Sequence, residues 1–486
     1  MKVMFVSAEV SPLAKVGGLA DVAGSLPKAL RALGHDVRIV MPAYQMVLDD
    51  PQWGAKRIRQ GVPVKINSKW QKAMDVYEVN LGGVPVYMIG TDEWFTESNR
   101  SEALYLPGGD HYLFFSVAAL KLPKALGWRP DVVHCNDWHT GFVPVLMRER
   151  DPFEWAQTAS VFSIHNLAYQ GEFDIDVLDR LDLPRCLYNP NQLETFGTVN
   201  FLKAGMVFAD QVNTVSPRYA LEIQTPQYGC RLEGLMRYLD EQDRLTGVLN
   251  GIDQEMFNPA TDPDLPAHFS IDDLAGKKIC RTKLFEELEL PEIPDTPVMG
   301  VVSRISTQKG MDLIIAAAEA VLPRAQLIVL GAGDPVIADA FHLLKRHFKD
   351  RVAFHEGFHL SLAPRIYAGC DMFLMPSAFE PCGLGQMIAM RYGTVPIVRF
   401  TGGLADTVAD EENGFVFYEK TGSAFAMAVN RAIDAFHRPD DWSALVHACM
   451  AADHSWSISA HEYEKIYERA LASLDCGAAT GIAVRG

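Results

Sequence analysis

The feature that most constrains this chain is a short apolar strand followed by a glycine-containing turn and a helix-like segment. Residues 2–7 form the strand-like run, Gly17 and Gly18 follow, and apolar side chains then recur at helical spacing until Gly34. Residues 37–40 begin a second strand. A strand, a crossover helix and another strand in this order favour a parallel sheet with right-handed connections.

The same pattern restarts near residue 298. Residues 298–302 and 325–330 are strand-like and residues 310–321 are helix-like. The pentapeptide Gly-Gly-Leu-Ala-Asp occurs at 17–21 and again at 402–406. We interpret it as one strand-loop-helix arrangement that is used once in each half, with chance recurrence as the alternative. The sequence therefore predicts two α/β domains with doubly wound parallel sheets.

Length and charge exclude several classes of protein. The 486 residues suffice for two or three domains, and 48% hydrophobic residues support a large core. Lys and Arg (44) minus Asp and Glu (61) give −17, which argues against nucleic acid and anionic membranes as partners.

The first apolar run is closed by Glu9, too early for a signal peptide, and no run is long enough to span a membrane. The eight cysteines are scattered, so we expect reduced, mostly buried thiols in a cytoplasmic protein.

Several polar residues follow predicted strands in the first half. Lys15 precedes Gly17 and Gly18 at the start of a helix, where free amides, a partial positive charge and a close backbone approach favour a phosphate. An ordinary glycine-rich turn with a solvated lysine is the alternative. His134–His139 and Ser163–Asn166 end two further strands without metal-ligand spacing, so we expect partners for sugar hydroxyls rather than a metal site.

The second half carries two cations and one carboxylate at strand ends. Arg304 and Lys309 lie five residues apart between a strand and a helix, and such a pair suits a diphosphate. Glu380 follows the strand at 372–375, and its turn fits an acceptor for sugar hydroxyls. Surface cations and a charge at a helix start are the alternatives. Cys382 has no base beside it in the sequence and is interpreted as an inert thiol.

Taken in order, these segments resemble the bacterial glycogen synthase and plant starch synthase family over nearly the whole chain. The resemblance rests on K-V-G-G-L-A-D-V (15–22), R-P-D-V-V-H-C-N-D-W-H (129–139), H-N-L-A-Y-Q-G (165–171), F-L-K-A-G (201–205), V-N-T-V-S-P (212–217), V-L-N-G-I-D (248–253), S-R-I-S-T-Q-K-G (303–310), G-A-G-D-P (331–335), F-E-P-C-G-L (379–384), R-Y-G-T-V-P (391–396) and T-G-G-L-A-D-T-V (401–408). It implies two Rossmann-like doubly wound domains that face each other across a cleft, the GT-B fold. It also implies retaining transfer of glucose from ADP-glucose to an α-1,4-glucan, without cofactor or metal.

The resemblance divides the chain into three parts. It implies an N-terminal Rossmann-like domain on the acceptor side over residues 1–247. A C-terminal Rossmann-like domain on the nucleotide-sugar side covers residues 248–456. Residues 457–486 are expected to form a helix that packs back on the N-terminal domain and ends in a frayed tail.

The resemblance also assigns roles to individual residues. The catalytic set is Asp137, His165, Arg304, Lys309 and Glu380. The substrate-binding set is Lys15, Gly17, Gly18, Asp21, Asn250, Phe358, Gly383 and Leu384. Within these sets, Arg304 and Lys309 neutralise the leaving diphosphate, Glu380 binds hydroxyls of the donor glucose, and Phe358 stacks on adenine.

Three departures from the family pattern leave alternatives open. Residues 108–120 lack the Arg that the family often has before an aromatic residue there. Ala378 and Gly385 stand where the family commonly has Arg and Thr, which bears on donor affinity and base preference. A UDP-glucose-dependent enzyme, a related enzyme that makes a small glycoside, and an inactive glucan-binding paralogue are the rival functions.

Overall fold

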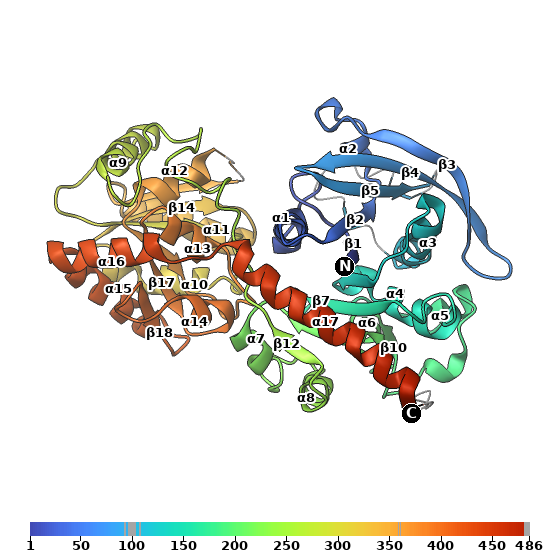
Figure 1. Cartoon of the computed structure of the whole chain (residues 1–486). Helices are drawn as coiled ribbons and strands as arrows, with labels where there is room; N and C mark the ends of the chain where they lie inside the picture. The colour runs from blue at the N-terminus through green and yellow to red at the C-terminus, as the bar shows by residue number, and fades with distance from the viewer. Residues whose placement is uncertain (92–93, 96–103, 106–107, 358, 360, 481–486) are drawn as a thin grey trace. The chain divides into compact units, whose positions relative to one another are not determined.

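Each of the two predicted series of apolar strands forms its own largely parallel sheet in the computed structural model (Figure 1). The structure describes residues 1–91, 94–95, 104–105, 108–357, 359 and 361–480. The chain divides into two units. Unit 1 contains Met1–Val215, Ala220–Gly251 and the segment from Trp456, and unit 2 contains Ser216–Tyr219 and Ile252–Ser455. The chain thus passes into unit 2 after Gly251, and also briefly at 216–219.

Unit 1 is built on a sheet with the strand order β12-β11-β7-β6-β1-β2-β5-β4-β3. The strands are β1 (Lys2–Val6), β2 (Asp36–Pro42), β3 (Lys56–Lys65), β4 (Gln71–Leu81), β5 (Val84–Gly90), β6 (Val132–Asn136), β7 (Ala159–Ile164), β11 (Gln211–Thr214) and β12 (Leu245–Gly247). From β12 to β5 all neighbours are parallel. Because β1 pairs with both β2 and β6, the strand order reverses beside β1, as in a doubly wound sheet.

Helices and a small second sheet complete unit 1. The helices are α1 (Gly18–Ala32), α2 (Gln45–Leu48), α3 (Asp110–Leu126), α4 (Phe142–Val145), α5 (Asp176–Arg180), α6 (Phe201–Phe208), α7 (Pro217–Glu222, which begins in unit 2), α8 (Glu233–Glu241) and α17 (Trp456–Thr480). The small sheet is antiparallel and has the order β8 (Glu172–Phe173), β10 (Thr198–Asn200) and β9 (Glu194–Thr195).

Strands β3 and β4 are antiparallel additions that the parallel pattern does not predict. A two-glycine turn connects β4 to β5, and Gly82 and Gly83 have φ of 57° and 88°, values that glycine adopts readily. Asn80 Oδ1 accepts a hydrogen bond from the Gly83 N–H at 2.8 Å. This local turn geometry, rather than the apolar pattern, sets the direction of the edge strands.

Unit 2 is built on an all-parallel sheet with the order β15-β14-β13-β16-β17-β18. Its strands are β13 (Val298–Val302), β14 (Gln326–Gly331), β15 (Val352–Glu356), β16 (Met372–Met375), β17 (Val395–Arg399) and β18 (Phe415–Phe417). Its helices are α9 (Ala275–Glu287), α10 (Met311–Val321), α11 (Pro335–His347), α12 (Leu362–Gly369), α13 (Gly385–Arg391), α14 (Gly402–Thr407), α15 (Gly422–Phe436) and α16 (Pro439–Ala451). The order reverses between β13 and β16.

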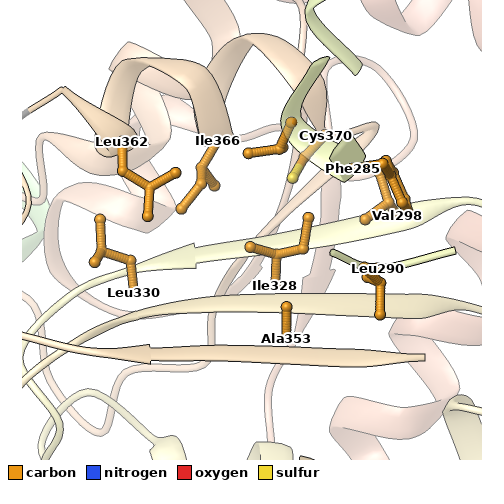
Figure 2. Packing of buried hydrophobic residues seen from close by; sticks show 10 residues of the cluster. Phe285, Leu290, Val298, Ile328, Leu330, Ala353, Leu362, Ile366 and Cys370 are labelled. Atoms are coloured by element: carbon orange, nitrogen blue, oxygen red, sulfur yellow. The ribbon is translucent and has the colours of Figure 1, made fainter. Parts of the chain in front are cut away.

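Helices cover both faces of this sheet, which explains why its strands are nearly continuous apolar runs. Figure 2 shows one face, where Leu362 and Ile366 of α12 pack over Ile328 and Leu330 of β14. On the other face, side chains of α10 and α15 meet the alternate strand residues. These are Ile314 and Phe425 against Met299, Leu327 and Leu374. Successive residues of a strand point to opposite faces, so the two helix layers share each strand between them.

Helix α17 is joined to the sheet of unit 1 by a chain of buried hydrogen bonds. The Tyr467 hydroxyl lies 2.8 Å from His134 Nδ1, and His134 Nε2 lies 2.6 Å from the Ser163 hydroxyl. Ser163 donates to Asn213 Oδ1, whose amide donates to the Tyr463 hydroxyl at 3.1 Å. Strands β6, β7 and β11 are therefore linked to α17 through side chains. The helix continues to Thr480, into the tail that we expected to fray, and residues 481–486 lie outside the described residues.

His134 corrects one expectation. Both of its ring nitrogens have partners within unit 1 and the residue is 0% exposed, so no sugar hydroxyl reaches it. Burial lowers the pKa of His134 to about 3. His134 is a neutral structural residue that holds α17.

Most cysteines among the described residues are buried. Cys135, Cys280, Cys370, Cys382 and Cys449 are buried, whereas Cys186 is exposed and Cys230 is partly so. Among the described residues, no helix combines the length and apolarity needed to cross a bilayer.

The hydrogen bond between Tyr467 and His134 gives a first prediction. Tyr467→Phe removes the hydroxyl but leaves the ring, so a buried imidazole nitrogen loses its partner. We expect the free energy of unfolding of unit 1 to fall by about 1–3 kcal/mol, measured by thermal or denaturant unfolding. Tyr238→Phe is the matched control, because Tyr238 is 53% exposed and its loss of a hydroxyl leaves no buried group unpaired. Equal stability of the two variants would contradict the structural role of His134.

Candidate active site

Every described candidate residue lies in a loop after a parallel strand or at the start of the helix that follows. In unit 1, Lys15, Gly17, Gly18 and Asp21 follow β1, Asp137 follows β6, His165 follows β7 and Asn250 follows β12. In unit 2, Arg304 and Lys309 follow β13, while Glu380, Gly383 and Leu384 follow β16. The carboxyl ends of parallel strands share one edge of a sheet, so each unit gathers its candidates at one edge. Phe358 lies outside the described residues.

The loop between β1 and α1 is organised by two carboxylates. Glu9 is only 3% exposed, and its Oε2 accepts hydrogen bonds from the Val16 N–H at 2.6 Å and the Gly17 N–H at 2.8 Å. Its other oxygen accepts a hydrogen bond from the Tyr105 hydroxyl. Lys15 Nζ is 2.7 Å from Asp21 Oδ1. The lysine and the glycine backbone are therefore held in place from within unit 1.

Burial shapes the protonation of both carboxylates. Burial raises the pKa of Glu9, although the two backbone N–H groups that it accepts from oppose the rise. Burial also raises the pKa of Asp21, against the opposing charge of Lys15. Glu9 is a residue that the sequence reasoning used only as the end of an apolar run. The signal in the sequence that indicates its role as an anchor is a carboxylate shortly after a buried strand, where it can accept hydrogen bonds from the loop that follows.

The two Gly-Gly-Leu-Ala-Asp segments begin the helices α1 and α14, each of which follows a parallel strand. The glycines of the two segments have different surroundings. A Cβ atom on Gly17 or Gly18 would meet nothing within 4 Å. On Gly402 it would come within 1.9 Å of the Glu380 carbonyl oxygen, and on Gly403 within 2.2 Å of the Cys382 carbonyl oxygen. The second pair of glycines is needed because the Glu380 turn packs on it, whereas the first pair leaves open space that a ligand can approach.

Asp137 anchors the end of β7. It has a φ of 54°, and its Oδ1 accepts the His165 N–H at 2.8 Å. Burial raises the pKa of Asp137 to about 7, although the backbone N–H groups of His165 and Asn166 oppose the rise. Burial lowers the pKa of His165 to about 3, so its ring is neutral at physiological pH.

The His165 ring has a defined role as an acceptor. Its Nε2 donates to Asn136 Oδ1 at 2.9 Å, because an amide oxygen can only accept, and Nδ1 is left to accept from a hydroxyl. Asn250 offers a second unsatisfied acceptor in unit 1. Asn250 is 6% exposed, and its side-chain oxygen Oδ1 has no hydrogen-bond partner within the described part of the chain. Both atoms suit recognition of a polyol.

In unit 2 the predicted cation and carboxylate meet. Lys309 Nζ is 2.6 Å from Glu380 Oε2, and the same oxygen accepts the Ser377 hydroxyl at 3.0 Å. The Glu380 side chain is 7% exposed and that of Lys309 is 19% exposed, so the pair is largely shielded from water. The sequence reasoning placed Lys309 on a phosphate and Glu380 on a sugar, and the structure adds that they bind each other.

The loop that carries both cations is tightly packed at its end. Gly310 has a φ of 71°, and a Cβ atom there would come within 2.0 Å of the Pro376 carbonyl oxygen, so only glycine fits. The Ala378 N–H donates to the Gln308 carbonyl oxygen at 2.7 Å. These contacts fix the loop after β13 against the loop after β16. Arg304 is exposed, and no ion pair involves it within the described residues.

The turn after Glu380 leads into α13. Gly383 has a φ of 76°, and its carbonyl oxygen accepts from the Gln386 amide at 2.9 Å. Leu384 is the N-cap residue and makes no side-chain cap, so the first N–H groups of α13 receive no bond from it. Among the described residues, no group of three or more His, Cys, Asp or Glu is placed to hold a metal ion.

Comparison with known proteins places these features in a family. Residues 2–238 match the model of the starch synthase catalytic domain, and residues 283–444 match that of glycosyl transferases group 1. The glycogen synthase of Moorella thermoacetica is 44% identical over 97% of this chain and 97% of its own length. That of Thermotoga maritima is 43% identical over 98% of this chain and all of its own length (100%).

Solved structures agree with these sequence matches. The catalytic domain of starch synthase IV from Arabidopsis thaliana, bound to ADP and acarbose, matches with a TM-score of 0.89 at 34% identity, covering 97% of this chain and 99% of that one. Sucrose-phosphate synthase from Thermosynechococcus elongatus matches with a TM-score of 0.60 at 19% identity, which shows a shared fold. The predicted GT-B fold with two Rossmann-like domains is confirmed.

The raised pKa of Asp137, about 7, predicts a pH dependence of stability. The folded chain keeps the Asp137 proton up to about pH 7, whereas an unfolded aspartate releases it near pH 4. Asp137 therefore costs stability as the pH rises through this window, by up to about 1.4 kcal/mol per pH unit. In Asp137→Asn this loss is absent, and asparagine tolerates a positive φ. We expect the melting temperature of the native chain to fall relative to that of the variant between pH 4.5 and pH 7.

Asp243→Asn is the control for this comparison, because Asp243 also has a φ of 54° but is exposed. It should follow the native pH profile. Parallel profiles for native chain and Asp137→Asn would mean that Asp137 is ionised in the folded protein throughout.

Proposed function

Because the chain belongs to the family of bacterial glycogen synthases and plant starch synthases and is a glucosyltransferase, we propose that its donor is ADP-glucose. Glucose passes, with retention of configuration, to the 4-hydroxyl at the non-reducing end of an α-1,4-glucan. The observation that carries this proposal is the ion pair of Lys309 and Glu380 at the edge where β13 and β16 are neighbours, with Arg304 on the same loop as Lys309. The binding of ADP and acarbose by the Arabidopsis relative supports the choice of donor and acceptor.

The unit 2 residues act on the leaving group and the donor sugar. The bond from glucose C1 to the diphosphate oxygen breaks, and negative charge grows on the diphosphate. Arg304 and Lys309 stabilise that charge where it develops, with Arg304 gripping two oxygens and Lys309 acting as a point charge. Glu380 accepts hydrogen bonds from donor glucose hydroxyls and keeps Lys309 in place. Gly383 and Leu384 offer N–H groups, and Phe358 stacks on adenine.

The unit 1 residues act on phosphate and sugar hydroxyls. Lys15 and the Gly18 backbone contact the donor phosphates, whereas the Gly17 N–H is already bonded to Glu9 and Gly17 contributes the open space beside them. Asp21 orients Lys15. Nδ1 of the neutral His165 ring and the side-chain oxygen Oδ1 of Asn250 accept hydrogen bonds from hydroxyls of the transferred glucose. Asp137 fixes the loop that carries His165.

The reaction needs no covalent intermediate in this proposal. Glu380 pairs with Lys309 and accepts the Ser377 hydroxyl, so in this scheme it positions other groups and is not a nucleophile. The acceptor hydroxyl attacks C1 from the face on which the diphosphate departs, and its proton passes to the leaving phosphate oxygen. The C1–O bond to the glucan thus replaces the C1–O bond to the diphosphate, and ADP is released.

Donor preference is the first test. Radiolabelled glucose from ADP-glucose and from UDP-glucose is offered with glycogen, and turnover with each donor is measured. We expect at least about tenfold higher kcat/KM with ADP-glucose, a transition-state difference of about 1.4 kcal/mol. A tenfold preference for UDP-glucose would overturn the donor. Label in a small acceptor but not in glycogen or maltooligosaccharides would overturn the acceptor, and an inert protein that binds glycogen would be a scaffold.

Loss of Lys309 is the second test. Lys309→Ala removes a cation from the leaving diphosphate, so we expect kcat to fall by at least about 100-fold, as for loss of one electrostatic stabiliser. Arg324→Ala is the matched control, because Arg324 is an exposed cation of unit 2 that pairs with Asp434 at 2.6 Å. It should keep native kcat. A near-native kcat in Lys309→Ala would remove Lys309 from the mechanism.

A further inference from the structure

The turn that carries Glu380 is held by donors from outside the turn. It runs from Ser377 to Cys382 between β16 and α13, and Pro381 contributes no N–H group of its own. The carbonyl oxygens of Ser377, Ala378 and Pro381 accept from two side chains elsewhere in unit 2, Arg399 and Ser216. These carbonyls lie on both sides of Glu380 in the chain.

Arg399 holds the residues before Glu380. It ends β17 and is 7% exposed. Its Nε donates to the Ser377 carbonyl oxygen at 2.8 Å, and its guanidinium also donates to the Ala378 carbonyl oxygen. The planar guanidinium presents these donors in a fixed fork, so two successive carbonyls are set at once. Ser377 in turn donates its hydroxyl to Glu380 Oε2.

Ser216 holds the residue after Glu380. It is 0% exposed, and its hydroxyl donates to the Pro381 carbonyl oxygen at 2.6 Å while accepting the Tyr219 N–H at 3.2 Å. Ser216 follows β11 of unit 1 in the chain, yet the segment 216–219 belongs to unit 2.

Two further contacts fix this segment on unit 2. The Arg218 N–H donates to Asp406 Oδ2 at 2.8 Å, and the Arg218 guanidinium lies 5.1 Å from the centre of the Phe400 ring. Ser216 therefore approaches the turn from a segment that is itself anchored at α14 and at the end of β17.

The turn has little freedom once these donors are in place. A Cβ atom on Gly402 would come within 1.9 Å of the Glu380 carbonyl oxygen, so the turn lies directly on the start of α14. Glu380 must bring its carboxylate to Lys309 across 71 positions of the chain. A shift of the turn by a fraction of an ångström would change that 2.6 Å contact between Glu380 and Lys309. It would also change where both side chains meet the nucleotide sugar.

We propose that Ser216 and Arg399 are positioning residues for the reaction, which set Glu380, and through it Lys309, in the geometry that the donor requires. The proposal rests on the roles given above to Glu380 and Lys309. Ser216 and Arg399 touch no substrate in this scheme. Their effect on turnover passes through the Glu380 turn, so it must vanish when Glu380 itself is disabled.

A double-mutant comparison tests this inference. Ser216→Ala in the native background should lower kcat by about tenfold or more, because small displacements of a catalytic group are costly. In a Glu380→Gln background the same change should lower kcat by less than about twofold, since coupled residues are not additive. All measurements use the full chain, glycogen and the nucleotide sugar that the native chain prefers.

Controls separate positioning from stability. Thr421→Ala removes a matched side-chain cap in unit 2, at the start of α15, where the Thr421 hydroxyl accepts the Ala424 N–H at 3.2 Å. It should reduce stability without changing kcat. Arg399→Lys provides a second variant, because lysine keeps the charge but not the fork, and it should show the same non-additivity with Glu380→Gln. Ser216→Cys covers the case in which Ser216→Ala does not fold, since a thiol is a similar but weaker donor.

The results distinguish a failure of the positioning role from a failure of the role proposed for Glu380. Equal fold losses for Ser216→Ala and Arg399→Lys in the native and Glu380→Gln backgrounds would overturn the positioning role. A native kcat in both variants would overturn it as well. If Glu380→Gln alone keeps native kcat, the role proposed for Glu380 fails, and that result is read before any double variant is made.

Discussion

The ion pair between Lys309 and Glu380 depends on β13 and β16 lying side by side, although the two residues are 71 positions apart in the chain. A largely buried carboxylate is costly unless a cation and further donors satisfy it, and Lys309 and Ser377 do so here. The sheet order reverses between these two strands, which is where α/β sheets bind their ligands. The strands that bury the apolar residues of unit 2 therefore also bring the charges of Lys309 and Glu380 together.

Unit 1 uses carboxylates in a different way. Glu9 and Asp137 follow neighbouring strands β1 and β6. Glu9 accepts two backbone N–H groups of its own loop, and Asp137 accepts the His165 N–H of the loop after β7. The two bonds of Glu9 hold the loop that carries Lys15, and the bond of Asp137 holds the start of the loop that carries His165. Loops that are held in this way have little conformational entropy left to lose when a ligand binds.

Two segments belong to a different unit from the residues that directly precede them in the chain. Helix α17 returns to unit 1, where Tyr463 and Tyr467 meet a chain of polar side chains on β6, β7 and β11. Ser216 contributes to unit 2, where its hydroxyl meets the Glu380 turn. In both cases a buried hydroxyl supplies the hydrogen bond, and such bonds specify a partner more sharply than apolar packing does, because an unpaired buried polar group is expensive.

The strand-loop-helix pattern of both sheets can be predicted from the amino-acid sequence, because apolar runs and the residues that end them are local properties of the chain. The same holds for the positions of Lys15, Arg304, Lys309 and Glu380 in the segments that follow predicted strands. The sequence did not reveal Glu9, Ser216 or Arg399 as supports, nor the structural role of His134, nor the antiparallel strands β3 and β4. These features became visible in the folded chain alone, since each depends on a partner elsewhere in the chain or on turn geometry. A side chain's hydrogen-bond partners follow from which strands become neighbours, and that choice is made by the packing of the whole unit.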